Sequence, residues 1–235
     1  MTPFISEFIG TSILILLGNG VVANVVLAKT NGNSGGWIVI TFGWAMAVFV
    51  GVYVTAAASG AHLNPAITIG LAFKTGSWTL VPTYIAAQIL GAMFGSLLVW
   101  ISYRLHYDAT ENKDFIKATF CTAPAIRSNL NNFISEFIGS FLLMLGVLFI
   151  SKGDMKLGAL DALPVALLVL AIGLSLGGST GYAINPARDL GPRIMHFILP
   201  IKHKGNSDWA YSWIPVLAPI AGALLAVWIS SFLLP

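Results

Sequence analysis

Six long apolar runs decide what this chain of 235 residues can fold into. Each is close to the roughly 20 residues that an α-helix needs to cross about 30 Å of hydrocarbon. The runs are residues 4–27, 37–58, 79–103, 133–150, 162–178 and 211–234. Hydrophobic residues make up 57% of the chain and charged residues only 9%, unlike a water-soluble domain. We therefore predict an all-α integral membrane protein with six transmembrane helices.

The apolar runs favour helices over the other structure that spans membranes. A membrane β-barrel needs segments of about ten residues in which apolar and polar side chains alternate. The stretch ITFGWAMAVFVGVYV, residues 40–54, would instead be apolar on both faces of a strand. The N-terminus MTPFISEFIG has no basic region before its apolar segment, so we do not expect a cleavable signal peptide.

The chain contains an internal repeat. FISEFIG occurs at residues 4–10 and again at 133–139, and SGAHLNPAIT at 59–68 is matched by TGYAINPARD at 180–189. We divide the chain into halves 1–104 and 131–235, joined by a connecting loop at 105–130. Each half holds an odd number of spans, so the second half enters the bilayer from the opposite side. We expect an inverted repeat that builds one domain over residues 1–235.

Each half contains an Asn-Pro-Ala triplet followed by an apolar segment too short to span, 64–73 and 185–196. Asn is a preferred N-cap and Pro fits the first helical turn, so each triplet predicts the start of a half-helix. We expect the Asn64 and Asn185 amides to donate hydrogen bonds at the pore centre. Two helix N-termini meeting there would repel cations and hydronium. The predicted half-helix starts are Pro65, Ala66, Pro186 and Ala187.

These motifs resemble those of the aquaporin or major intrinsic protein family, over nearly the whole chain. The resemblance rests on SGAHLNPA at 59–66, GYAINPARD at 181–189 and the duplicated SEFIG. It implies an aquaporin-like bundle of six transmembrane helices and two re-entrant half-helices around a pore, with four subunits in a homotetramer. Asp189, Arg193 and the pair Pro215-Val216 resemble the pattern of the glycerol-conducting branch, the aquaglyceroporins.

Residues shared by both halves are candidates for structural roles. Carboxylates inside a membrane span are costly and are expected to be paired. We predict that Glu7 and Glu136 accept hydrogen bonds from the loops before the half-helices. Asp189, which replaces Thr68 of the first half, is also expected to be structural and to tie down a neighbouring loop. A proton-relay role for the two glutamates is the alternative. The backbone carbonyls expected to line the pore belong to Gly60, Ala61, His62, Gly181 and Ala183.

Residues that differ between the halves are candidates for selectivity. The family resemblance implies a selectivity filter built from Trp44, Gly173, Tyr182 and Arg188. Since Gly173 has no side chain, we expect a wide filter, with an aromatic corner facing the Arg188 guanidinium. The alternative is that Trp44 faces lipid or packs in the bundle, as most membrane tryptophans do. The tryptophans at span ends are expected to be interface anchors: Trp37, Trp78, Trp209 and Trp213.

This filter predicts a passive channel for glycerol and related small neutral solutes, with water, that excludes protons and ions. A water-selective pore, in which Tyr182 closes the gap left by Gly173, is an alternative. A proton-coupled solute transporter is another. We expect no cofactor and no metal, because four scattered histidines and one cysteine form no ligand set. No enzyme is expected, since no catalytic group set occurs, and the net charge of +3 is too dispersed for nucleic acid.

The resemblance implies a multi-pass protein of the plasma membrane with cytoplasmic termini. The distribution of basic residues opposes this orientation, because cytoplasmic loops normally carry the excess of Lys and Arg. Three such residues would lie inside, namely Lys74, Lys152 and Lys156. Eight would lie outside, namely Lys29, Arg104, Lys113, Lys117, Arg127, Arg193, Lys202 and Lys204. We expect Arg193 to belong to the second half-helix rather than to a loop.

Overall fold

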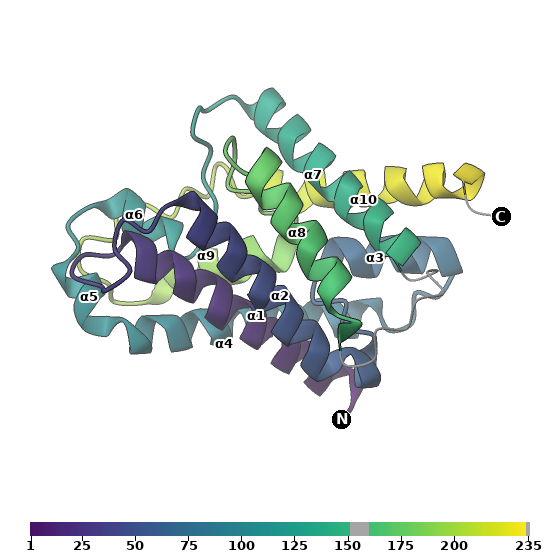
Figure 1. The fold of residues 1–235 in the computed structure, drawn as a ribbon, viewed down its shortest axis with the longest axis horizontal. Coiled ribbons are helices and arrows are strands. Elements are labelled where there is room, and N and C mark those ends of the chain that lie inside the picture. Colours follow the sequence, from purple (N-terminus) through teal and green to yellow (C-terminus); the bar gives the residue numbers. More distant parts are fainter. Residues whose placement is uncertain (151–159, 234–235) are drawn as a thin grey trace.

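The computed structural model describes residues 1–150 and 160–233, and this part of the chain is helical without strands. Figure 1 shows the helices gathered into one bundle, with α5 and α6 together at one end. The helices are α1 (Pro3–Val26), α2 (Trp37–Ser59), α3 (Pro65–Thr75), α4 (Val81–Ser102), α5 (Arg104–Ala109), α6 (Lys113–Ala118), α7 (Asn129–Ile150), α8 (Leu163–Leu176), α9 (Pro186–Ile198) and α10 (Ile214–Leu233).

The predicted class, an all-α membrane protein, is confirmed. Among the described residues, α1, α2, α4, α7 and α10 are long and apolar enough to cross a bilayer. The span predicted at 162–178 is shorter: α8 has 14 residues, or about 21 Å of helix. It ends at Leu176, where the turn GGST begins. Lys152 and Lys156, which entered the charge count, lie outside the described residues.

The two half-helices begin directly after the asparagines of the triplets. Helix α3 starts at Pro65 and has 11 residues, while α9 starts at Pro186 and has 13. At 1.5 Å per residue they measure about 17 and 20 Å, too short to cross the hydrocarbon. Arg193 lies within α9, as predicted.

The two halves of the chain interlock. In the first half α1 packs between α2 and α4, and in the second α7 packs against α10 and α8. Each half-helix, however, also packs against the last long helix of the other half, α3 on α10 and α9 on α4. Helices α2 and α8 lie side by side, which adds a further contact between the two halves (Figure 1). The halves therefore form one packed body.

Glycines allow the closest helix crossings, and they do so at matching places in the repeat. A Cβ at Gly91 would lie 2.4 Å from the carbonyl oxygen of Phe8, so α4 and α1 touch backbone to backbone. A Cβ at Gly222 would lie 2.3 Å from the carbonyl oxygen of Phe137, the repeat equivalent of Phe8. Gly95 makes a similar close approach, 2.6 Å from the Ser12 carbonyl oxygen. Gly91 and Gly95 thus permit the close crossing of α4 and α1, as small residues do in membrane bundles.

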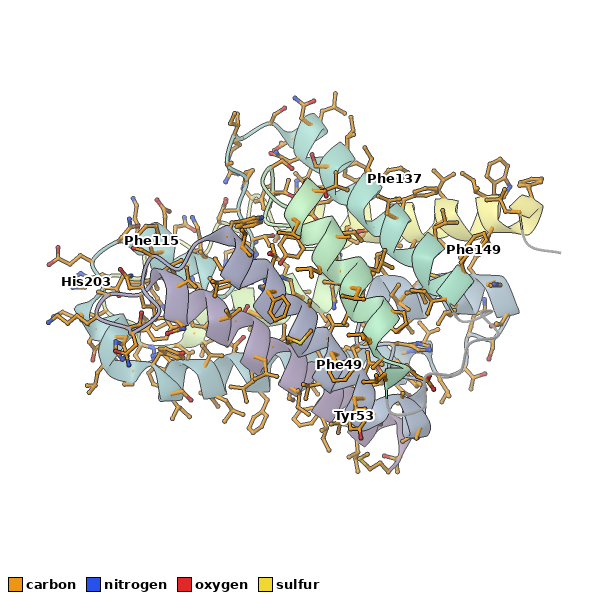
Figure 2. The ribbon with its side chains drawn as sticks, in the orientation of Figure 1. Phe49, Tyr53, Phe115, Phe137, Phe149 and His203 are labelled. Atoms are coloured by element: carbon orange, nitrogen blue, oxygen red, sulfur yellow. The ribbon has the colours of Figure 1, made fainter. Side chains whose placement is uncertain are left out.

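The outer surface of the bundle is apolar. Figure 2 shows Phe49 and Tyr53 on α2 and Phe149 on α7, with side chains on the outside of the helices. Tyr53 is 59% exposed and Phe149 is 42% exposed. Large apolar groups outside a core are unfavourable in water but suit a helix that faces lipid. Phe115 and His203 lie at the end of the bundle that carries α5 and α6 (Figure 2).

Candidate functional site

A cavity of about 210 Å³ lies at the centre of the bundle. Much of its lining consists of apolar side chains of the surrounding helices: Leu14, Val48, Val52, Ile67, Leu71, Leu143, Val147, Val165 and Val169. The two loops that precede the half-helices, residues 60–64 and 182–185, also line it, together with Trp44 and Arg188. The lining is thus mainly apolar, and its polar groups come from the two loops and Arg188.

The two loops share an unusual backbone conformation. Ala61 and Leu63 have φ angles of 49° and 50°, and their repeat equivalents Tyr182 and Ile184 have φ angles of 37° and 43°. Left-handed conformations at residues with side chains cost on the order of 1–3 kcal/mol each and persist only where the surroundings hold them. Successive N–H groups in such a conformation form a concave site that binds anions. The anion in each half is a buried carboxylate.

Glu7 holds the first loop. Its Oε1 accepts hydrogen bonds from the Ser59 hydroxyl at 2.6 Å and the His62 N–H at 2.9 Å. Its Oε2 accepts from the Leu63 N–H at 2.7 Å and from the Gln88 side-chain amide at 2.8 Å. The carboxylate is fully buried on α1. These bonds satisfy a charge that would otherwise be very unfavourable within a membrane span.

Glu136 holds the second loop from the equivalent position on α7. Its two oxygens accept from the N–H groups of Ala183 and Ile184, both at 2.9 Å. The partners are the repeat equivalents of His62 and Leu63, so the sequence repeat is also a repeat of hydrogen bonds. The contacts expected for the two glutamates are present. Gln88 and Ser59, which add donors to Glu7, were not recognised from the sequence.

The two asparagines join the loops to each other. The side-chain oxygen of Asn64 accepts from the Ala66 N–H at 2.9 Å, and that of Asn185 accepts from the Ala187 N–H at 3.0 Å. The Asn64 amide donates to the Ile184 carbonyl at 2.8 Å, and the Asn185 amide donates to the Leu63 carbonyl at 2.8 Å. Each amide therefore already has one acceptor within the protein. Because a side-chain amide has two N–H groups, one on each asparagine is left for a permeant.

Arg188 lies over Trp44 in the cavity wall. The guanidinium carbon is 4.2 Å from the centroid of the Trp44 ring, and Nη1 donates to the Phe120 carbonyl at 3.3 Å. Trp44 is only 4% exposed and packs on Gly18, so the alternative in which it faces lipid is wrong. Arg188 was expected across from the aromatic corner. Instead it is stacked on one of the two aromatic rings, as a cation–π pair.

Tyr182 occupies the space beside Gly173. A Cβ at Gly173 would lie 2.9 Å from Cζ of Tyr182, so the ring rests directly on this part of α8. Among the described residues that line the cavity, Gly173 and Gly181 are not included, whereas Tyr182 is. The expectation of an opening widened by Gly173 is corrected, since the missing side chain makes room for the tyrosine ring. Gly60, Ala61, His62 and Ala183, whose carbonyls were expected to face the pore, are among the residues that line the cavity.

A buried ion pair supports the second half-helix. Asp189 Oδ1 accepts from Arg193 Nε at 2.8 Å, and its Oδ2 accepts from the N–H and hydroxyl of Thr122 at 2.8 and 2.6 Å. Arg193 also donates to the carbonyls of Thr122 and Ser207. Both charged side chains are fully buried. Asp189 thus ties a loop in place, and Arg193 joins that loop to the segment after α9.

The loop held by Asp189 belongs to the connecting segment 105–130, which was expected only to join the halves. Residues 119–122 turn inward and are buried, and Phe120 places its carbonyl against Arg188. The sequence signal for this was weak: TFCTAPAI, residues 119–126, is a short, mainly apolar stretch in a polar segment. His62, in the other loop, contacts Thr68 through Nδ1 at 3.2 Å.

Comparison with known proteins gives a consistent result. The family model described as "Major intrinsic protein" matches residues 1–230. The chain is 56% identical over 232 residues to "Glycerol uptake facilitator protein" of Streptococcus pneumoniae, covering 98% of this chain and 99% of that protein. It is 52% identical over 222 residues to "Glycerol uptake facilitator protein 3" of Lactiplantibacillus plantarum, covering 94% and 92%.

A solved structure agrees with these sequence matches. The X-ray structure of the aquaglyceroporin from Plasmodium falciparum superposes with a TM-score of 0.85 at 35% sequence identity. The superposition covers 96% of this chain and 93% of that one. The similarity therefore extends over both halves of the repeat and both half-helices.

Proposed function

Because the chain belongs to the major intrinsic protein family, whose members are channels rather than enzymes, we propose that it is a passive channel for glycerol and other small neutral solutes, with water. The observation that carries this proposal is the mixed lining of the central cavity, which combines apolar side chains with polar groups of the two loops and Arg188. A glycerol molecule has a hydrocarbon edge and a hydroxyl edge. The apolar side chains suit the first, and the loops with Arg188 suit the second.

The proposed selectivity filter consists of Trp44, Tyr182 and Arg188, with Gly173 behind the tyrosine ring. All three side chains are more than nine-tenths buried and meet in the cavity wall. Arg188 has five N–H donors and no acceptor, and its Nη1 contacts the Phe120 carbonyl. Its other donors offer hydrogen bonds to hydroxyl oxygens. The rings of Trp44 and Tyr182 supply the apolar contact for the carbon chain.

Cations and protons are proposed to be excluded at two places, the centre of the pore beside Asn64 and Asn185 and the selectivity filter beside Arg188. Asn64 and Asn185 are the N-caps of α3 and α9, so both helix N-termini point at the same region of the cavity. Each N-terminus carries the equivalent of roughly half a positive charge. Arg188 adds a full charge nearby. A neutral molecule with lone pairs is accepted by the remaining asparagine N–H groups, whereas a cation is repelled.

Stopped-flow light scattering on proteoliposomes tests the proposal. We expect glycerol permeability well above that of empty liposomes, with no glycerol accumulation against its gradient. Glycerol permeability equal to that of empty liposomes, together with fast water flow, would instead support the water-selective alternative. That alternative is favoured by one observation, the packing of the Tyr182 ring on Gly173, which narrows the filter.

A proton-coupled transporter is the less favoured alternative. Glu7 and Glu136 each accept hydrogen bonds from backbone N–H groups through both oxygens, so both carboxylates are already engaged in holding the loops before the half-helices. An imposed pH gradient is the direct test. Uphill glycerol movement driven by that gradient would establish coupling, and equilibration alone would exclude it.

We further propose one channel domain over residues 1–235, a homotetramer, and a plasma-membrane location with cytoplasmic termini. Interlocked packing of the halves supports the single domain. Mass measurement in nanodiscs tests the tetramer. Orientation is testable by labelling in intact cells, because Cys121 is buried and gives little background. We expect a cysteine introduced at exposed Lys202 to react from outside and one at exposed Lys74 only after permeabilisation.

A further inference from the structure

We propose that Trp37 is a positioning residue for the filter: it holds the ring of Tyr182 against α8 and so sets the width of the opening. The inference rests on the proposed channel function and adds a residue to it. Trp37 is the first residue of α2 and is 40% exposed. By sequence position it looks like an interface anchor, but its contacts point into the bundle.

The first contact of Trp37 is a hydrogen bond to α8. Its indole Nε1 donates to the carbonyl oxygen of Gly173 at 3.0 Å. Gly173 lies in the last turn of α8, which ends at Leu176. Through this bond Trp37 ties the start of α2 to the end of α8.

The second observation concerns the surface on which Tyr182 rests. Gly173 and Gly177 are four residues apart, so they share one face at the end of α8. A Cβ at Gly177 would lie 2.4 Å from Cδ1 of Tyr182 and 2.8 Å from Cζ2 of Trp37. A Cβ at Gly173 would lie 2.9 Å from Cζ of the same tyrosine. The Tyr182 ring thus packs on both glycines, and the Trp37 ring packs beside it on Gly177.

The third observation is that Tyr182 depends on packing for its position. Trp37 meets it edge to face, with ring centroids 5.8 Å apart and an interplanar angle of 78°. Within the described chain, the Tyr182 hydroxyl is buried without a hydrogen-bond partner. No polar bond of this hydroxyl fixes the ring. The position of the ring is set by its packing on Gly173 and Gly177 and by its contact with the Trp37 ring.

Removal of the Trp37 ring would therefore free Tyr182 to move away from the cavity. A wider filter would pass larger polyols relative to glycerol. The effect should require Tyr182, because Trp37 itself is not among the described residues that line the cavity. This dependence separates a positioning role from a general loss of stability, which would lower all permeabilities together.

The experiment compares the erythritol-to-glycerol permeability ratio in proteoliposomes. The variants are Trp37→Ala and Trp37→Phe, and Trp209→Phe is the control. Trp209 is 41% exposed and also makes an edge-to-face contact, with Phe197, away from the filter. We expect Trp37→Ala to raise the ratio by at least about twofold, the size typical of coupled neighbours. Trp37→Phe, which lacks the N–H, should show a smaller rise, and the control none.

A double-variant cycle completes the test. In a Tyr182→Ala background, Trp37→Phe should leave the ratio unchanged, because the ring that Trp37 positions is gone. An unchanged ratio in folded Trp37→Ala protein would overturn the proposal, as would an equal effect of Trp37→Phe with and without Tyr182. If Trp37→Ala does not fold, the Trp37→Phe cycle decides alone. Failure of the wild type to conduct glycerol would reject the channel function itself, which is a different outcome.

Discussion

The guanidinium of Arg188 stacks on the indole ring of Trp44, with 4.2 Å between the guanidinium carbon and the ring centroid. Among the described residues that line the cavity, Arg188 is the only Lys, Arg, Asp or Glu, and this contact holds it against an apolar surface. A cation–π contact is worth about 0.5–2 kcal/mol, depending on how dry the site is. Because the ring takes up none of the N–H groups in hydrogen bonds, those not bonded to the Phe120 carbonyl are left for oxygen atoms.

Replacement of Arg188 by Val should weaken the exclusion of cations. The change removes a positive charge from the cavity and leaves the Phe120 carbonyl without its donor. We expect proton leak to rise about tenfold or more, which corresponds to about 1.4 kcal/mol of barrier. A pH-sensitive dye inside proteoliposomes measures the leak. Arg188→Lys keeps the charge and should exclude protons nearly as well. Equal leak in wild type and Arg188→Val would assign all exclusion to the asparagine region.

The contact between Gly173 and Tyr182 predicts a conditional effect. Gly173→His alone should destabilise the protein, because its Cβ would lie 2.9 Å from the tyrosine ring and overpacking costs about 1–3 kcal/mol. Gly173→His with Tyr182→Cys removes the clash and should favour water over glycerol. Melting temperature in detergent and the glycerol-to-water permeability ratio are the measurements. A double variant with an unchanged ratio would refute the filter assignment.

The buried pair of Asp189 and Arg193 should be far more sensitive than a surface pair. Asp189→Asn leaves Arg193 buried without a counter-charge, and breaking a buried pair in this way costs about 3–5 kcal/mol. Asp114→Asn is the control, since the pair Asp114–Lys117 is exposed at Asp114 and such pairs contribute about 0–1 kcal/mol. Thermal unfolding in detergent compares the two. Similar melting temperatures of the two variants would contradict our view that Asp189 and Arg193 hold residues 119–122 in place.

Glu136→Gln tests the hold on the second loop. A glutamine presents one oxygen and one NH₂ group, so one of the N–H groups of Ala183 and Ile184 loses its acceptor. A buried polar group left unpaired costs about 1–3 kcal/mol. We expect a lower melting temperature and lower glycerol flux, because the loop lines the cavity. Glu111→Gln, on an exposed side chain, should change neither.

Much of this architecture follows from the sequence repeat. The triplets at Asn64 and Asn185 contain both a cap and a helix-starting proline, so the half-helix starts depend only on local geometry. Glu7 and Glu136 were recognisable as paired groups because a carboxylate in a membrane span needs donors. Their positions in the repeat then pointed to the loops that supply them.

Other features depend on contacts that no local pattern encodes. The inward turn at Phe120 and Thr122 relies on Asp189, about 70 residues later in the chain. Trp37 occupies a position typical of interface anchors, and only its three-dimensional neighbours reveal the bond to Gly173. Gly173 itself was interpreted as an empty space, because a sequence does not show which neighbouring ring fills it.

The exchange of half-helices between the two halves also determines when the pore can form during synthesis. Helix α3 packs on α10, and the Asn64 amide bonds to the Ile184 carbonyl, so the first Asn-Pro-Ala loop acquires its final partners only after most of the chain exists. Such distant contacts make closure a late step of folding. A ribosome-bound first half therefore lacks the partners that complete the first Asn-Pro-Ala loop, and the pore can form only once the second half has been made.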